Sequence, residues 1–195
     1  MACKRIFIAI NLPEEIKEEL EKLKKEINSL YPAEWRRGLV KWVKKENLHI
    51  TLLFIGAVEL EKIPLIIKIT EEVARENKFS RLQIAKINYG PSAKIPPRLI
   101  WAELGKNTAL DKAAQELREK TLEKGVFSKT DSKPFSAHIT LGRIRTWQWR
   151  RINPEEQPMI DRYVNLSFLP SSIAVMESVL KRTGPQYSEL AKVKL

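Results

Sequence analysis

The sequence predicts an α+β fold, and two of its features support this prediction. Short stretches of alternating apolar residues, the pattern of β-strands, are interleaved with longer stretches in which apolar residues recur every three or four positions, the pattern of helices. In addition, the tetrapeptide HITL occurs twice, at His49 and at His138, each time within a strand-like stretch. The repeat indicates two related halves, so we expect residues 1–195 to form a single domain of two packed lobes.

The first predicted elements are a strand and a helix. Three isoleucines alternate along residues 4–11, which is the periodicity of a strand. Pro13 then stands where a helix can begin, and apolar residues recur at spacings of three and four as far as Tyr31. This apolar stripe consists of Ile16, Leu20, Leu23, Ile27 and Leu30. We expect the charged opposite face of the helix to be solvated.

The remainder of the first half contains the first HITL. Residues 39–43 and 49–55 are predicted to be strands, joined by the turn-like sequence KKEN at 44–47. Because this connection is tight, the sheet must contain at least one antiparallel pair. Residues 64–77 are predicted to form a second helix.

The second half repeats the same kinds of element. We predict strands at 82–88 and 99–104, a helix at 109–124, and a strand that holds the second HITL. Two further strands are predicted near the end of the chain, at 172–180 and at 189–194, and the last of them is expected to close an edge of the sheet.

The composition narrows the range of functions. The net charge of +11 favours an anionic partner such as nucleic acid, because clustered Lys and Arg displace counterions from phosphates. Abundant Lys and Glu are equally typical of proteins adapted to heat, in which surface ion pairs cost less. The opening stretch MACKRIFIAINLPEE has one short apolar run, so we expect no signal peptide, no membrane span and a cytoplasmic location.

A metal or redox site is not expected. Cys3 is the only cysteine, so neither an intramolecular disulfide nor a Cys-rich zinc site can form. The two histidines have no clustered Asp, Glu or Cys beside them, which leaves a zinc site short of ligands. We therefore expect chemistry without a metal or a cofactor.

The pattern His-x-Thr has a chemical meaning on a strand. Side chains alternate across a strand, so His49 and Thr51 share one face about 6 to 7 Å apart, and His138 and Thr140 do the same. If a pseudo-twofold axis relates the halves, both pairs can face one cleft. In-line displacement at phosphorus needs a neutral imidazole to deprotonate water and a protonated one opposite it. The threonine hydroxyls can donate hydrogen bonds to the non-bridging oxygens. In the simpler alternative, each histidine is a hydrogen-bonded core residue.

The repeated HxTx motif resembles that of the 2H phosphoesterases, and among them the chain is similar to the RNA 2′,3′-cyclic phosphodiesterases, also called 2′-5′ RNA ligases. The stretches that carry the resemblance are RIFIAINLP, VKWVKKENLHITLLFIG, RLIWAEL, FSAHITLGR and ESVLKRTGPQY. The resemblance implies a bilobal fold in which two pseudo-symmetric lobes line a central cleft with antiparallel sheets and carry their helices outside. It also implies an RNA substrate that ends in a 2′,3′-cyclic phosphate, with tRNA-derived ends as one candidate, and a monomeric enzyme.

The resemblance assigns roles to the motif residues. His49 is implied to be the proton donor to the leaving 3′ oxygen and His138 the proton acceptor from water, while Thr51 and Thr140 hold the phosphate. The reaction implied is hydrolysis to a 2′-phosphate, with reversible 2′-5′ joining as a possible second activity. The residue before the second histidine is Ala137, where the family pattern leads us to expect proline. This departure makes the strand less rigid but removes no reacting group.

Three further residues are candidates for substrate binding. Arg143 belongs to the second motif only, because Phe54 holds the equivalent place in the first, which suggests a phosphate contact. Strand alternation places Arg143 on the opposite face from His138 unless Gly142 allows a bulge, and a structural ion pair is the alternative role. Trp42 and Tyr187 are candidates for lining a nucleotide pocket.

The remaining aromatic residues leave alternatives open. For Trp42, and likewise for Trp101, packing in the core is the other interpretation. The stretch RIRTWQWRR at 143–151 can bind RNA by stacking and charge, or its tryptophans can cover an edge of the core.

Two other functions remain compatible with the sequence. One is a non-catalytic basic RNA-binding module in which the HITL strands are only scaffold. The other is a 2H enzyme acting on a different cyclic phosphodiester. Only an enzyme would turn over a small cyclic nucleotide.

Overall fold

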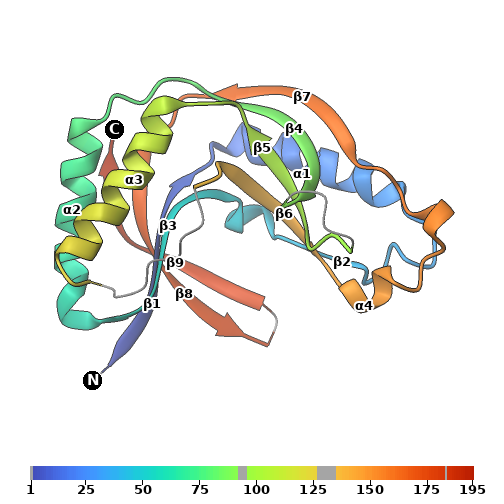
Figure 1. The fold of residues 1–195 in the computed structure, drawn as a ribbon, viewed down its shortest axis with the longest axis horizontal. Helices are drawn as coiled ribbons and strands as arrows, with labels where there is room; N and C mark the ends of the chain where they lie inside the picture. The colour runs from blue at the N-terminus through green and yellow to red at the C-terminus, as the bar shows by residue number, and fades with distance from the viewer. Residues whose placement is uncertain (1, 92–95, 127–134, 183) are drawn as a thin grey trace.

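The computed structural model describes residues 2–91, 96–126, 135–182 and 184–195 (Figure 1). In these residues the chain forms an α+β fold, as predicted. The helices are α1 (Glu14–Ser29), α2 (Ile63–Glu76), α3 (Thr108–Glu123) and the short α4 (Thr146–Trp149). The strands are β1 (Cys3–Asn11), β2 (Val40–Trp42), β3 (His49–Glu59), β4 (Leu82–Gly90), β5 (Leu99–Leu104), β6 (His138–Ile144), β7 (Asp161–Phe168), β8 (Ser172–Lys181) and β9 (Gly184–Lys194).

These strands form one sheet in the order β7-β4-β5-β6-β3-β1-β8-β9, and β2 pairs with β6. The two HITL strands, β3 and β6, are neighbours near its middle, where Ile50 pairs with Ile139. This short ladder joins the half made of β7, β4, β5 and β6 to the half made of β3, β1, β8 and β9. The predicted strand at 189–194 lies in β9, at an edge of the sheet as expected.

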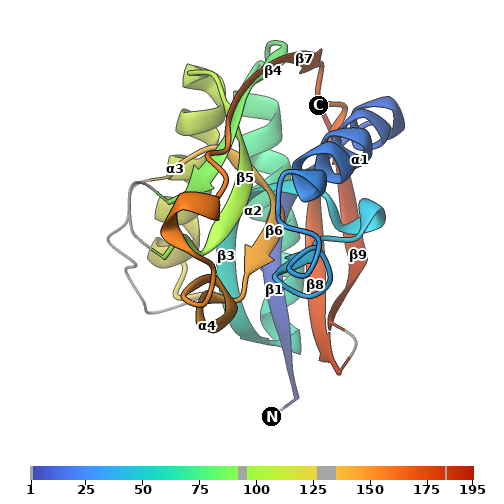
Figure 2. The same ribbon diagram turned by 90° about the vertical axis from the view of Figure 1, so that its right-hand side faces the viewer.

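The long helices lie on different parts of the sheet. Figure 1 shows α2 and α3 side by side at one end of the molecule, where they pack against each other and against β3, β8 and β9. Helix α1 lies apart from α2 and α3 (Figure 2) and contacts β7 and the 3-10 turn at Lys45–Asn47. No helix in the described residues is both long and apolar enough to cross a membrane.

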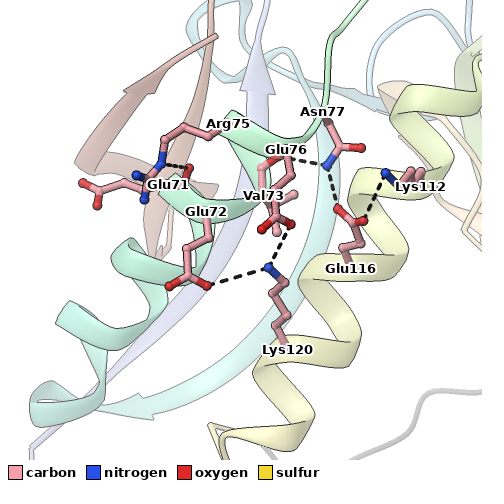
Figure 3. Close-up of polar contacts among 9 residues, drawn as sticks. All are labelled: Glu71, Glu72, Val73, Arg75, Glu76, Asn77, Lys112, Glu116 and Lys120. Carbon is pink, nitrogen blue, oxygen red and sulfur yellow. Dashed lines mark hydrogen bonds and ion pairs between the residues drawn. The ribbon is translucent and has the colours of Figure 1, made fainter.

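Polar contacts join α2 to α3 (Figure 3). The buried Asn77, just beyond the end of α2, donates a hydrogen bond to the Val73 carbonyl and another to Glu116 of α3, at 2.6 Å. Lys120 of α3 forms ion pairs with two glutamates of α2, Glu72 and Glu76. These contacts fix the two helices to one another as a unit that covers one half of the sheet.

Strand β1 is buried on both faces, which places the core and the site on opposite sides of it. Ile6, Ile8 and Ile10 alternate as predicted and belong to the main core. The residues between them, Phe7 and Ala9, form a smaller cluster with Ala174 and Met176 of β8, against which Tyr187 packs. The chain thus has a second apolar layer beneath the site described below.

Two sequence-based expectations are wrong in detail. Leu30, placed in the apolar stripe of α1, is 56% exposed because the helix ends at Ser29 and Leu30 lies beyond its last turn. The strands on either side of residues 44–47 do not pair with each other. Both β2 and β3 run antiparallel to β6, along successive parts of it, so the 3-10 turn Lys45–Asn47 continues the chain direction instead of reversing it.

Two elements were not predicted. Strand β7 is an edge strand with mostly exposed residues, so the sequence DRYVNLSF lacks a clear apolar alternation. Helix α4 is a single turn whose stretch, 146–149, is too short for helical periodicity. Thr183, within the quoted stretch ESVLKRTGPQY, lies outside the described residues.

Candidate active site

The two HITL strands carry a β-bulge at the same place. In β6, three consecutive residues face two consecutive residues of β5, and the partners are Thr140 with Trp101 and Gly142 with Ile100. Leu141 is therefore the extra residue of the bulge. In β3 the same shift occurs against β1, where Thr51 pairs with Ala9 and Leu53 with Ile8, which makes Leu52 the extra residue.

The bulge changes which side chains face the site. In both strands the histidine and threonine are partly exposed, two consecutive buried residues follow, and the next residue is exposed. That exposed residue is Phe54 in β3 and Arg143 in β6. The bulge that Gly142 could allow is therefore present, and it places Arg143 on the same face as His138.

Gly142 allows a close approach between β6 and β2. A Cβ atom at this position would lie 2.5 Å from Cγ1 of Val40 and 3.1 Å from Cε3 of Trp42. Any larger residue would push β2 away, so glycine keeps Trp42 at the site. The Trp42 indole is fixed further by donating a hydrogen bond to Oδ1 of Asn28, at 3.2 Å.

One cavity of about 430 Å³ collects the residues expected from the sequence. The seven that line it are His49, Thr51, His138, Thr140, Arg143, Trp42 and Tyr187. Sequence reasoning missed several others that line the same cavity, among them Arg5, Phe7, Lys41, Lys44 and Phe54. For Phe54 the signal was present, because it occupies the place of Arg143 in the first HITL motif.

His49 is held by its backbone and by aromatic neighbours. Its Nδ1 lies 2.7 Å from the carbonyl oxygen of Asn47, and its Nε2 lies 3.0 Å from Oγ1 of Thr51. A carbonyl oxygen only accepts, so Nδ1 carries the proton and Nε2 is the nitrogen available for proton transfer. The ring packs against Phe7 and Tyr187, with centroids 5.0 and 5.4 Å away.

His138 is held in a related way. Its Nδ1 donates to the carbonyl of Ser136 at 2.8 Å, which again leaves Nε2 for chemistry. Its ring packs on Trp101 with centroids 4.5 Å apart. Trp101 is only 9% exposed and donates its indole N–H to Oδ1 of Asn88, so it serves both the core and the site.

Burial lowers the pKa of both histidines below the usual value near 6.5. For His49 the hydrogen bond to Asn47 opposes this effect, and the proximity of His138 adds to it. For His138 the bond to Ser136 opposes it, and the positive charge of Arg143 lowers the pKa further. These effects favour the neutral form of both imidazoles, and an anionic ligand would favour their protonation.

The cavity wall is positively charged. Arg5, Lys41, Lys44 and Arg143 line it, and Lys41 lies directly opposite Arg143 on the neighbouring strand. Like charges directly opposite each other destabilise a sheet. Within the described residues Arg143 forms no ion pair with a carboxylate, so the alternative role as a structural ion pair has no partner there. An anion bound in the cavity would relieve the repulsion.

The described residues contain no group of three or more His, Cys, Asp or Glu side chains that could hold a metal ion.

The tryptophans of 143–151 differ in role. Trp149 is 4% exposed and packs against Tyr31 and Tyr89, whereas Trp147 is 55% exposed.

An antiparallel α+β fold with two HxT strands meeting at one cavity is the arrangement of the 2H phosphoesterases. Residues 10–101 match the family model of LigT-like phosphoesterases. An RNA 2′,3′-cyclic phosphodiesterase of Archaeoglobus fulgidus is 32% identical over 193 residues, covering 95% of this chain and 97% of its own. An RNA 2′,3′-cyclic phosphodiesterase of Thermotoga maritima is 29% identical over 196 residues, covering 95% of this chain and 92% of its own. The chain therefore belongs to the family of RNA 2′,3′-cyclic phosphodiesterases.

Solved structures show the same fold. A crystal structure of a Thermus thermophilus protein superposes with a TM-score of 0.81 and 27% identity, covering 98% of this chain and 97% of that one. Escherichia coli LigT in complex with 3′-AMP superposes with a TM-score of 0.74 and 25% identity, covering 100% and 99%. The match extends over both halves of the sheet, so both HITL strands are included.

Proposed function

We propose that the protein hydrolyses the terminal 2′,3′-cyclic phosphate of RNA to a 2′-phosphomonoester by acid–base catalysis with two histidines. The observation that carries this proposal is that β3 and β6 bring two imidazoles, each with Nδ1 engaged and Nε2 available, to one cavity. The names of the relatives and the nucleotide bound by Escherichia coli LigT support the substrate class.

In the proposed mechanism His138 is the base and His49 the acid. Nε2 of neutral His138 takes a proton from water as the water oxygen bonds to phosphorus. The bond from phosphorus to the 3′ oxygen breaks, and protonated Nε2 of His49 gives its proton to that oxygen. The positive charge of Arg143 beside His138 supports this assignment, because it favours the neutral form of His138.

The phosphate is held by groups on the same face. Thr51 and Thr140 donate hydrogen bonds to the non-bridging oxygens, and Arg143 neutralises their charge. Trp42 and Tyr187 lie at the wall of the cavity, where they contact the terminal nucleotide. If a 5′-hydroxyl attacks phosphorus in place of water, His138 takes its proton, the 3′ oxygen leaves with a proton from His49, and a 2′-5′ linkage forms.

The finer parts of the proposal come from the sequence. They comprise a monomeric cytoplasmic enzyme of one domain with two related lobes, an RNA end for which tRNA-derived ends are a candidate, and catalysis without metal or cofactor. The shared bulge of β3 and β6 supports the relation between the lobes.

The test is incubation with a 2′,3′-cyclic mononucleotide in excess chelator, followed by identification of the product by phosphorus NMR. The proposal predicts full activity and a 2′-phosphate as the single product. No turnover would favour a non-catalytic RNA-binding module or a different cyclic phosphodiester. Turnover that is lost in chelator and restored by zinc or manganese would indicate a metal-dependent hydrolase.

A further inference from the structure

A positively charged surface with one exposed aromatic residue lies beside the cavity. We call it the arginine–tryptophan surface, and it consists of Arg37, Arg145, Trp147, Arg150 and Arg151, all of which are exposed. Trp147 and the two following arginines are three and four residues apart around α4, so they share one face. The Arg151 guanidinium lies over the Trp147 ring, 5.1 Å from its centroid.

This surface is continuous with the cavity. Arg143 lines the cavity, Ile144 is buried, and Arg145 is exposed again, so Arg143 and Arg145 point to the same side of the chain. The loop before β2, which contains Arg37, lies beside Arg145, because the Arg145 amide donates a hydrogen bond to the Leu39 carbonyl at 2.9 Å. Figure 1 shows α4 directly beyond the end of β6, at the other end of the molecule from α2 and α3.

The fold itself does not require these side chains. Several lysines on the long helices are paired with carboxylates, as Lys22 is with Glu19 and Lys120 with Glu76. By contrast, the arginines of the arginine–tryptophan surface form no ion pair with a carboxylate within the described part of the chain. The buried Trp149 fills the core beneath α4, which leaves Trp147 with no packing role of similar size.

Stacking aromatics interleaved with unpaired cations are the combination that binds single-stranded nucleic acid. Resting on the proposed function, we propose that the arginine–tryptophan surface binds the RNA strand on the 5′ side of the cyclic end. Trp147 stacks on a base there, and Arg145 and Arg151 neutralise phosphates. The cavity then selects the end of the RNA, while this surface selects a chain over a mononucleotide.

The inference is tested by fluorescence anisotropy with a 5′-labelled single-stranded RNA of about twelve nucleotides, a length within the usual site sizes. Trp147→Ala is expected to weaken binding at least about fivefold, because the stacked ring is lost, and Trp147→Phe to keep most of the affinity, because a phenyl ring still stacks on a base. Replacing Arg145 and Arg151 together by alanine is expected to weaken binding and to reduce the slope of log affinity against log salt by about 1.4, from about 0.7 for each phosphate contact.

The matched control removes two exposed positive charges elsewhere, with Lys68→Ala and Lys124→Ala on α2 and at the end of α3. This variant should bind the RNA as the parent protein does. Hydrolysis of a cyclic mononucleotide should be unchanged in every one of these variants. Because anisotropy needs no turnover, it decides the inference even if the proposed hydrolysis is absent.

Three results would overturn the inference. The first is RNA affinity within twofold of the parent in both the Trp147→Ala and the double arginine variants. The second is an equal loss in the lysine control, which would show an effect of net charge alone. The third is an equal loss of mononucleotide turnover, which would show that the substitutions distort the cavity.

Discussion

The indole of Trp101 packs on the imidazole of His138, and the strand next to it leaves room for the indole only because residue 90 is glycine. The ring centroids of Trp101 and His138 are 4.5 Å apart. A Cβ atom at Gly90 would lie 2.3 Å from Cδ2 of Trp101. A rigid indole cannot yield by that amount in place, so a side chain at residue 90 would move Trp101 and, with it, the support of His138.

Gly90→Ala is therefore expected to lower kcat about tenfold or more and to destabilise the fold by about 1 to 3 kcal/mol through overpacking. The measurements are turnover of a cyclic mononucleotide and unfolding in urea. Gly105→Ala is the matched control, because its added Cβ atom would meet nothing closer than 3.9 Å. Equal effects of the two substitutions would contradict a specific role for the contact between Trp101 and His138.

The two histidines are each expected to be indispensable for turnover. His49→Ala and His138→Ala should each reduce kcat/KM by about 10² to 10⁴, since each removes one proton-transfer partner. Both side chains line a cavity and are only partly buried, so the fold should survive. Circular dichroism and RNA binding serve as controls for folding. A rate near that of the parent protein in either variant would rule out the two-histidine mechanism.

The dependence of the rate on pH follows from the lowered pKa of both histidines. One imidazole must be neutral and the other protonated, so kcat/KM should be bell-shaped, with both limbs on the acid side of an ordinary histidine. Because the two titrations are coupled, the pKa of each limb is a property of the pair and not of one histidine alone. The bound phosphodiester is an anion that favours imidazolium, so the limbs of kcat should lie at higher pH than those of kcat/KM. Identical positions for both profiles would contradict a phosphate bound between the rings.

The sequence predicted those residues of the site that belong to a local pattern. His49, Thr51, His138 and Thr140 follow from the repeated motif and from strand alternation. The side to which Arg143 points depends on the bulge at Leu141, and a bulge is set by pairing with another strand. Alternation alone places Arg143 on the wrong face. The glycine that follows Leu141, and the presence of this arginine in the second motif only, indicated otherwise.

Other parts depend on contacts between distant segments. Lys41 joins the site because β2 pairs with β6 and not with β3, and a turn of four residues does not distinguish a reversal from a continued path. Tyr187 reaches His49 through the pairing of β9 with β8, a hairpin that brings it opposite Ser178. The edge strand β7 escaped notice because an exposed edge needs little apolar alternation. The helices and central strands bury regular apolar stripes, and for that reason their prediction was confirmed.

Folding stability should also depend on the two histidines. The folded state lowers the pKa of each, so the unfolded chain binds protons more readily. Their contribution to stability is therefore complete above about pH 6.5 and is lost as the pH falls toward the lowered values. Urea unfolding between pH 8 and pH 5.5 should show a decreasing free energy of unfolding. The variant with His49→Gln and His138→Gln should show a weaker decrease, and an unchanged dependence would mean that the histidines are not the source.

The last prediction separates the acceptor from the donor by using the charge of Arg143. That charge lowers the pKa of His138, whereas the charge that lowers the pKa of His49 is that of His138. Arg143→Gln removes the charge but keeps hydrogen-bond donors, and Arg143→Lys keeps the charge. The glutamine variant is expected to lose about ten- to a hundredfold in kcat/KM, because one cation facing the phosphate is gone.

The limbs of the pH profile carry the decisive information. If His138 is the acceptor, it must be neutral, so its protonation makes the larger contribution to the acidic limb of the coupled pair. Arg143→Gln should then move the acidic limb of kcat/KM to higher pH, because the imidazolium of His138 no longer faces a positive charge. Arg143→Lys should leave that limb near its original place. If the basic limb moves instead, His138 is the donor and His49 the acceptor.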